Sequence, residues 1–213
     1  MKEQKVIDYS LYLVTDRRWL ARRDLVDCVE EAVLGGVTVV QLREKDVDSR
    51  SFFQLALRMK ALTDRYGIPL MINDRLDIAQ AVDAAGVHLG LDDLPVPTVR
   101  KILGPGKIVG ASAATVEEAL RFEKEGADYL GVGAVFETAT KLGNESVTFD
   151  DLRSIKRAVN IPVVAIGGIK AENAGAVMGT GVDGVAVVSS ILAMPDIREA
   201  AIRLAAAVRG AGK

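Results

Sequence analysis

The feature that most constrains this chain is a regular alternation of short apolar runs with longer, charged segments of helical spacing. The runs are Leu11–Thr15, Thr38–Leu42, Leu70–Asn73, Gly86–Leu89, Lys107–Ala111, Asp128–Val132, Pro162–Ile166 and Gly184–Val188. The helical segments are Asp24–Leu34, Ser51–Arg65, Leu76–Ala84, Pro97–Leu103, Val116–Glu125, Phe149–Val159, Ala171–Met178 and Ile197–Val208. Repeated strand–helix units of this kind are typical of α/β proteins with a parallel sheet.

The strand near Val163–Ile166 is apolar at every position, which indicates a strand that is buried on both faces. Such units build either a closed barrel or an open doubly wound sheet, and eight even repeats favour the barrel. The 213 residues suffice for a (β/α)8 TIM barrel, which begins at roughly 200 residues. No Pro/Gly/Ser-rich linker divides the chain, so we expect one α/β barrel domain over residues 1–213.

Composition excludes several classes of protein. The chain has 27 basic and 29 acidic residues, and the basic ones form no stripe, which argues against a nucleic-acid partner. The N-terminal segment Met1–Ser10 has no signal-peptide core, and the apolar runs are too short to cross a membrane. The single Cys28 is either an inert core thiol, which we favour, or a nucleophile. We therefore expect a cytoplasmic protein.

Polar residues follow the predicted strands at their C-terminal ends, whereas the N-terminal ends are blander. They are Thr15-Asp16, Gln41–Lys45, Asn73-Asp74, Asp92-Asp93, Ser112, Thr138–Lys141, Gly167-Gly168 and Ser189-Ser190. In a barrel the C-terminal ends converge on the face that carries the active site. The sequence therefore predicts one site built from most of the strands.

Three polar residues at the second strand share one face. Gln41, Arg43 and Lys45 have the strand period of two, so they point the same way if the strand continues. An unpaired Arg inside a barrel is costly, so carboxylates or bound phosphate should match it. The alternative to phosphate binding is a structural ion-pair network with Asp74 or Asp93.

Asp74 and Asp93 end neighbouring predicted strands and suggest a metal site. Two carboxylates suit Mg²⁺, which completes its octahedron with water and phosphate oxygens. The alternative is that both residues are helix N-caps, since Asp commonly begins a helix after a strand. The cations at the second strand favour the metal.

Two further segments indicate phosphate binding. Gly167-Gly168 and Ser189-Ser190 follow strands 7 and 8, where barrels often build a phosphate site from backbone N–H groups. The long segment that contains Thr138–Lys141 is either a ligand-binding loop or a solvated one. His88, the only histidine, lies inside a strand and is more consistent with a satisfied interior group than with a general base. No Ser-His-Asp, Cys-His or zinc constellation is present.

Taken together, these segments resemble the thiamine-phosphate synthase family over nearly the whole chain. The matching segments are Gln41–Lys45, Ile72–Arg75, Gly86–Gly90 with Asp93, Gly110–Ser112, Thr138–Lys141, Ala165–Ile169 and Val187–Ser189. The segments QLREK and TATK are specific to the family, whereas the glycine pair is shared by many barrels.

The resemblance implies a transferase of thiamine biosynthesis that depends on Mg²⁺. It would condense 4-amino-2-methyl-5-(diphosphooxymethyl)pyrimidine with 4-methyl-5-(2-phosphooxyethyl)thiazole, releasing pyrophosphate by a dissociative mechanism. By this resemblance Asp74 and Asp93 hold the metal, and Arg43, Lys45, Lys141 and Ser112 are catalytic. The implied substrate contacts are Gln41, Leu42, Arg43, Glu44, Lys45, Asn73, Ser112, Thr138, Ala139, Thr140, Lys141, Gly168, Val188 and Ser189. Among them, Asn73 and Ser112 would contact the pyrimidine diphosphate.

Some positions depart from the family pattern. Leu91 stands where the family commonly has Gln, and Ala114 where it often has His. A thiazole tautomerase relative shares the barrel but uses a histidine after strand 6, where this chain has Ala134. The alternatives are that tautomerase, a different barrel enzyme such as a phosphosugar isomerase or aldolase, and a non-catalytic phospholigand-binding barrel. A homo-oligomer is compatible with the sequence.

Overall fold

Eight parallel strands form a closed barrel in this computed structural model, which describes residues 7–136 and 146–210. The strands are β1 (Leu11–Val14), β2 (Val39–Leu42), β3 (Leu70–Asn73), β4 (Gly86–Leu89), β5 (Ile108–Ala113), β6 (Tyr129–Val132), β7 (Val163–Ile166) and β8 (Gly184–Val187). Each strand pairs with its successor, and β1 pairs with β8 to close the ring. The expected (β/α)8 TIM barrel is confirmed.

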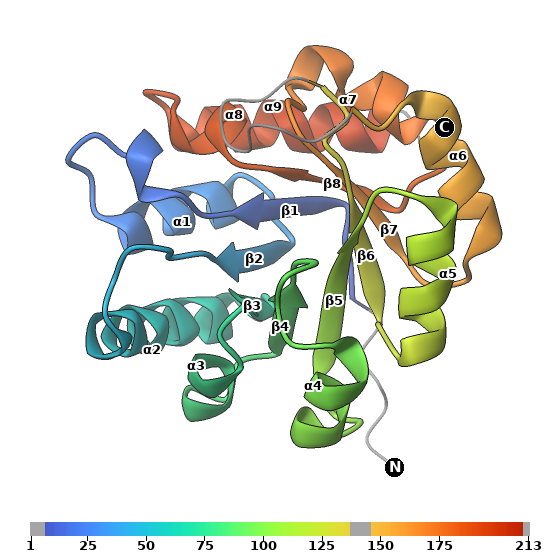
Figure 1. Cartoon of the computed structure of the whole chain (residues 1–213). Coiled ribbons are helices and arrows are strands. Elements are labelled where there is room, and N and C mark those ends of the chain that lie inside the picture. The colour runs from blue at the N-terminus through green and yellow to red at the C-terminus, as the bar shows by residue number, and fades with distance from the viewer. Residues whose placement is uncertain (1–6, 137–145, 211–213) are drawn as a thin grey trace.

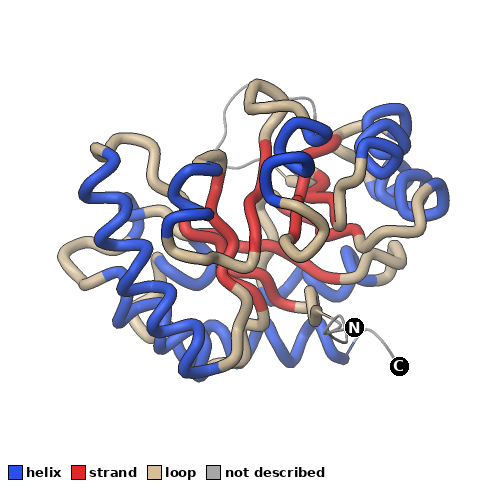
Figure 2. Tube along the Cα trace, turned by 90° about the horizontal axis from the view of Figure 1, so that it is seen from below, coloured by secondary structure: helices blue, strands red, loops and turns tan. Residues whose placement is uncertain are grey.

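Helices surround the barrel and cover its outer face (Figures 1 and 2). They are α1 (Leu25–Leu34), α2 (Ser49–Tyr66), α3 (Leu76–Ala81), α4 (Val96–Leu103), α5 (Val116–Glu125), α6 (Phe149–Ala158), α7 (Ala171–Met178), α8 (Ser189–Leu192) and α9 (Ile197–Gly210). A short 3₁₀-helix, η1 (Arg17–Trp19), follows β1. All of these helices fall short of the length and apolar character that a membrane crossing needs, within residues 7–136 and 146–210.

Two apolar layers hold the barrel together. A large outer core fills the space between strands and helices and includes Leu42, Ile72 and Cys28. The inner core lies inside the ring and comprises Tyr9, Tyr12, Val14, Val39, Met71, Tyr129, Val164 and Ala186. Along each strand, side chains enter the inner and the outer layer in turn, because successive side chains point to opposite faces. Burial raises the pKa of the Cys28 thiol, as expected for an inert core cysteine.

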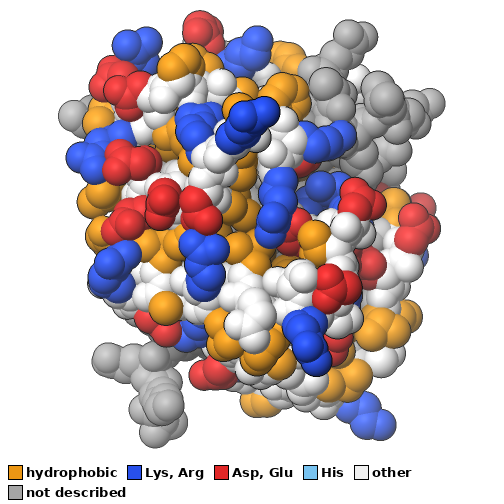
Figure 3. Space-filling model, turned by 90° about the vertical axis from the view of Figure 1, so that its left-hand side faces the viewer, with side chains coloured by type: hydrophobic (Ala, Val, Ile, Leu, Met, Phe, Trp, Pro, Cys, Tyr) orange, Lys and Arg blue, Asp and Glu red, His pale blue; other side chains and the backbone are white. Residues whose placement is uncertain are grey.

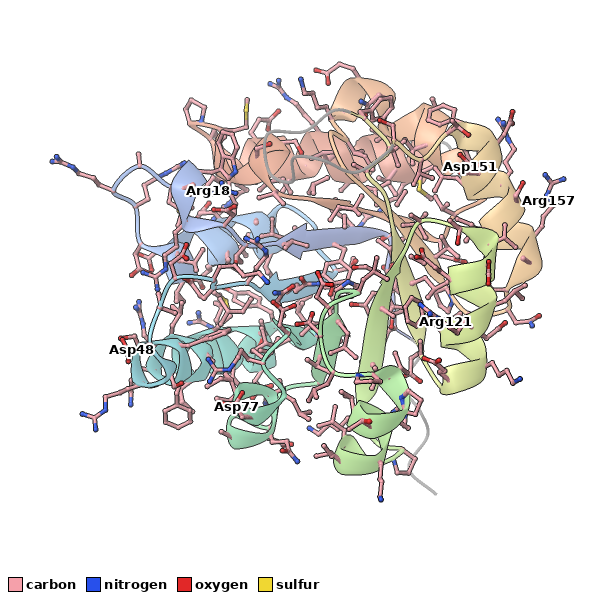
Figure 4. The ribbon with its side chains drawn as sticks, viewed as in Figure 1. Arg18, Asp48, Asp77, Arg121, Asp151 and Arg157 are labelled. Atoms are coloured by element: carbon pink, nitrogen blue, oxygen red, sulfur yellow. The ribbon has the colours of Figure 1, made fainter. Side chains whose placement is uncertain are left out.

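Side-chain caps begin several of the helices that follow the strands. Asp48 caps α2 by accepting a hydrogen bond from the Ser51 backbone N–H (3.0 Å), and Asp151 forms a capping box with Thr148 at α6 (Figure 4). Each cap satisfies backbone donors that the first helical turn leaves unpaired. The caps therefore fix where the chain leaves the strand-end face and turns back along the barrel.

The N-terminal ends of the strands have a side-chain pattern of their own. Before β2, β6 and β8, the side chain of the residue that precedes the strand accepts a backbone N–H near the start of the preceding odd-numbered strand. Thr38 accepts from Leu11 (3.1 Å), Asp128 from Val109 (2.7 Å) and Asp183 from Val163 (2.7 Å). These side chains tie adjacent strands together at the face opposite the site.

Arg100 on α4 fastens this opposite face most extensively. Its guanidinium donates to the backbone carbonyls of Gly126 (2.8 Å), Lys107 (2.6 Å) and Gly104 (3.2 Å), and it pairs with the Asp128 carboxylate. The side chain is 22% exposed, so these contacts are only partly screened by water. One residue thereby links α4, the start of β5 and the turn before β6.

We expect Arg100→Met to lower the free energy of unfolding by about 2–4 kcal/mol, because it leaves the backbone carbonyl groups without their donor and the Asp128 carboxylate without its guanidinium partner. Urea unfolding followed by circular dichroism measures this loss. Arg157→Ala is the matched control: its exposed side chain on α6 (Figure 4) donates, among the described residues, to the Arg153 carbonyl alone (3.1 Å). Equal stability of both variants would show that the Arg100 contacts do not hold this face together.

Candidate active site

The C-terminal ends of the strands bring the predicted polar residues to one face of the barrel. Figure 3 views this face, toward which the arrows of β1 and β2 point in Figure 1, and Lys and Arg side chains gather over its middle. Arg43 and Lys45 follow β2, Asn73 ends β3 and Asp74 follows it, and Asp93 follows β4. Thr138, Ala139, Thr140 and Lys141 lie outside the described residues.

Arg43 is held by the loop that follows β1. Its backbone N–H donates to the Thr15 hydroxyl (3.0 Å), and its guanidinium lies 3.7 Å from the buried Asp16 carboxylate. Arg18 of η1 clamps that same carboxylate (2.6 Å), and its hydrogen bonds hold the pKa of Asp16 below the usual range. The Asp16 carboxylate, which therefore favours its ionised form, gives the half-buried Arg43 a charged partner at the mouth of the barrel.

Lys45 and Glu44 occupy opposite environments. The Lys45 ammonium, half exposed, pairs with the Asp74 carboxylate. Glu44 is nearly buried and accepts from Arg17 (2.6 Å), while the Leu42 side chain packs in the outer core. The Leu42 side chain is therefore turned away from the barrel interior. The ion-pair network that the sequence left as an alternative is present, with Asp74 as the partner of Lys45.

Asp74 and Asp93 lie together at the ends of β3 and β4. The Asp74 backbone is in the left-handed region (φ 60°), and its N–H donates to the His88 carbonyl (2.9 Å). Asp93 accepts the Gly90 N–H (2.6 Å). Neither residue caps a helix, because the N-caps of α3 and α4 are Arg75 and Pro95. The N-cap alternative is therefore wrong.

The environment of this carboxylate pair fits a divalent cation. Burial raises the pKa of Asp93, and the neighbouring Asp74 carboxyl raises it further, although Lys45 partly opposes this. One ammonium group does not balance two ionised carboxylates, so the pair favours an additional cation. Its hard oxygen donors suit Mg²⁺. Among the described residues no group of three or more His, Cys, Asp or Glu side chains could hold a metal, so water and ligand oxygens would have to complete the coordination.

The loops after β7 and β8 form a separate region on the same face, and their backbone geometry suits an anion. Gly167 and Gly168 both have positive φ (109° and 62°), and a Cβ at Gly167 would lie 2.6 Å from that of Ala134. The Ser190 hydroxyl donates to the Ile169 carbonyl (2.7 Å), which ties the two loops together. Val188 is the N-cap of the short helix α8, and Ser189 is its first residue. This arrangement matches the recurrent phosphate site of such barrels.

Two residues of the site were missed by sequence reasoning, namely Tyr12 and Tyr129. The Gln41 side-chain N–H₂ donates to the Tyr12 hydroxyl (2.9 Å), which lies 2.8 Å from that of Tyr129. Tyr129 contacts His88 Nδ1 (2.8 Å), and His88 Nε2 contacts the Ser112 hydroxyl (3.0 Å). The sequence signal was a Tyr within each strand, since a buried Tyr hydroxyl requires a partner.

Comparisons with known proteins agree with this geometry. The family model for thiamine monophosphate synthase matches residues 11–191. The thiamine-phosphate synthase of Alkaliphilus oremlandii is 54% identical over 98% of this chain and its own full length, and that of Clostridium tetani is 54% identical over 92% of this chain and 94% of its own. The solved thiamine phosphate pyrophosphorylase of Pyrococcus furiosus superposes with a TM-score of 0.89 at 42% identity, covering 96% of this chain and 97% of its own. The chain therefore belongs to the thiamine monophosphate synthase family.

Proposed function

We propose that this transferase joins a pyrimidine carried as a methyl diphosphate to a thiazole monophosphate, giving thiamine phosphate and pyrophosphate within one barrel domain. The observation that carries the proposal is the grouping of polar side chains and backbone donors into two regions of the strand-end face, each suited to an anion. One, at β2–β4, combines Arg43 and Lys45 with the carboxylates Asp74 and Asp93. The other lies at β7–β8 around Gly168 and Ser189.

The β2–β4 region suits the diphosphate, because that group carries the larger negative charge and must leave. Arg43 and Lys45 would neutralise it, and Lys141, outside the described residues, would add a third cation. Mg²⁺ held by Asp74 and Asp93 would stabilise the charge that builds on the departing pyrophosphate. Ser112 and Asn73 would donate hydrogen bonds to the pyrimidine diphosphate, and Gln41 would contact the same substrate from β2.

The β7–β8 region suits the monophosphate of the thiazole. Backbone N–H groups at Gly168, Val188 and Ser189 would donate to the phosphate, and the lack of a Cβ at Gly168 would let the backbone approach it closely there. The hydroxyls of Thr138 and Thr140, outside the described residues, would add donors. With both phosphates fixed, the thiazole nitrogen would meet the pyrimidine methylene carbon as its C–O bond breaks.

The bond-making step requires no general base. Breaking the C–O bond leaves a cation that the pyrimidine stabilises, and the uncharged thiazole nitrogen supplies the electron pair of the new bond. No proton moves in this balance. His88, buried and hydrogen-bonded through both ring nitrogens, is accordingly not needed as a base.

The test incubates the protein with both phosphorylated substrates and Mg²⁺ and follows pyrophosphate enzymatically. We expect release only when both substrates are present, and none with EDTA. Conversion of a thiazole phosphate tautomer without the pyrimidine would instead identify the tautomerase, and tight binding of either substrate without turnover would identify a phospholigand-binding barrel.

A further inference from the structure

Five polar side chains form one continuous hydrogen-bonded chain across the barrel interior. It runs from Gln41 on β2 through Tyr12 on β1, Tyr129 on β6 and His88 on β4 to Ser112 on β5. The first four residues are buried, and both Tyr side chains are only 1% exposed. The two ends of the chain, Gln41 and Ser112, are residues that the proposed function places against the pyrimidine substrate.

The protons of this chain can be assigned from its first member. The side-chain nitrogen of Gln41 is only a donor, so the Tyr12 hydroxyl accepts there. Tyr12 then places its own proton on the only other partner of its hydroxyl among the described residues, Tyr129 (2.8 Å). Tyr129, having accepted, directs its proton to His88 Nδ1 (2.8 Å). Burial raises the pKa of both tyrosines, so each hydroxyl keeps the proton that this order requires.

We infer that this one-way chain holds His88 as the neutral tautomer with its proton on Nε2, and thereby makes Ser112 a hydrogen-bond donor to the substrate. His88 Nδ1 accepts from Tyr129, so the remaining proton lies on Nε2 and is donated to Ser112 Oγ. Ser112 then has its own proton free for a ligand oxygen. His88 and Tyr129 are positioning residues, since both act through Ser112.

The assignment of Ser112 as a substrate contact rests on the proposed function. A donor that already points outward before the substrate binds requires no reorientation as charge builds on the departing diphosphate. A serine without such a constraint could present a lone pair to that oxygen instead, which would oppose the reaction. The hydrogen-bonded chain therefore selects one of two orientations of the Ser112 hydroxyl group.

The tautomer is measured directly by NMR. His88 is the only histidine in the amino-acid sequence, so tag-free protein labelled with ¹⁵N gives a single imidazole spin system. We expect two-bond ¹H–¹⁵N correlations near neutral pH to show a protonated Nε2 and an unprotonated Nδ1. A proton on Nδ1, or an imidazolium with protons on both nitrogens, would overturn the inference.

Tyr129→Phe tests the consequence for catalysis. Loss of the donor to Nδ1 should leave a mixture of His88 tautomers and lower kcat about tenfold, the effect of one hydrogen bond at the reacting centre, with an unchanged KM for the thiazole phosphate. Tyr9→Phe is the matched control, because Tyr9 stacks on Tyr129 (4.9 Å between ring centroids) without joining the chain. Wild-type tautomer and kcat in Tyr129→Phe would contradict the positioning role.

The two readouts separate this inference from the proposed function. The NMR measurement needs no substrate, so it tests the His88 tautomer even if the protein catalyses another reaction. A protein that releases no pyrophosphate but shows the Nε2 tautomer would refute the function and leave the proton order in place. An active protein with the other tautomer would do the reverse.

Discussion

Replacing Asp93 with Asn is expected to lower the rate of pyrophosphate release about a thousandfold, because a metal site that loses one of its two carboxylates loses several kcal/mol of charge stabilisation. The isosteric amide can still contact the Gly90 N–H through its oxygen, so the loop after β4 should keep its shape. Steady-state assays at saturating concentrations of both substrates measure the effect.

Asp92→Asn is the matched control, since Asp92 is the neighbouring, exposed carboxylate of the same loop. A binding readout separates metal affinity from activity: Mg²⁺ should raise the Tm of the wild-type protein and of Asp92→Asn, but not that of Asp93→Asn. Asp93→Asn with wild-type turnover and a wild-type Tm response would place the metal elsewhere.

Replacing Arg43 with Met is expected to reduce kcat about a hundredfold, because the departing diphosphate loses a positioned cation in a partly buried site. Arg43 is preorganised by Thr15 through its backbone and by Asp16 through its guanidinium. Methionine keeps much of the apolar stem, so the loss should reflect charge and hydrogen bonding rather than packing.

Arg43→Lys should recover only part of this activity, since an ammonium group cannot reproduce the two-pronged contact of a guanidinium with phosphate. Arg153→Met is the matched control: Arg153 is on α6, and its ion pair with Asp150 (2.7 Å) spans one turn of the same helix. A kcat for Arg43→Met that equals that of the control would remove Arg43 from the diphosphate region.

Sequence periodicity predicted the elements of the barrel well but not every boundary. The predicted and observed helices coincide at Val116–Glu125 and Ala171–Met178, whereas β5 extends two residues beyond its prediction, to Ala113. The short helices η1 and α8 were not predicted. They are too short for a helical pattern, and contacts with the rest of the barrel hold them in place, such as that from Ser190 to Ile169.

The location of the candidate site was predictable because parallel strands bring their C-terminal ends to one face. That rule placed Lys45 near Asp74, and the structure pairs them. The rule says nothing about residues inside the strands, so it could not pair Tyr12 with Tyr129, which lie 117 residues apart. Nor could it show that Arg18 and Arg43 share the Asp16 carboxylate, because η1 was not expected.

The central claim is that one face of the barrel binds two phosphorylated substrates and joins them to each other in a reaction that requires Mg²⁺. The most direct measurement is the stoichiometry of thiamine phosphate and pyrophosphate, by chromatography and enzymatic assay, in a reaction with both substrates. The two products should appear in equal amounts, and only with Mg²⁺. Pyrophosphate formed without thiamine phosphate, or neither product in the presence of Mg²⁺, would contradict the account.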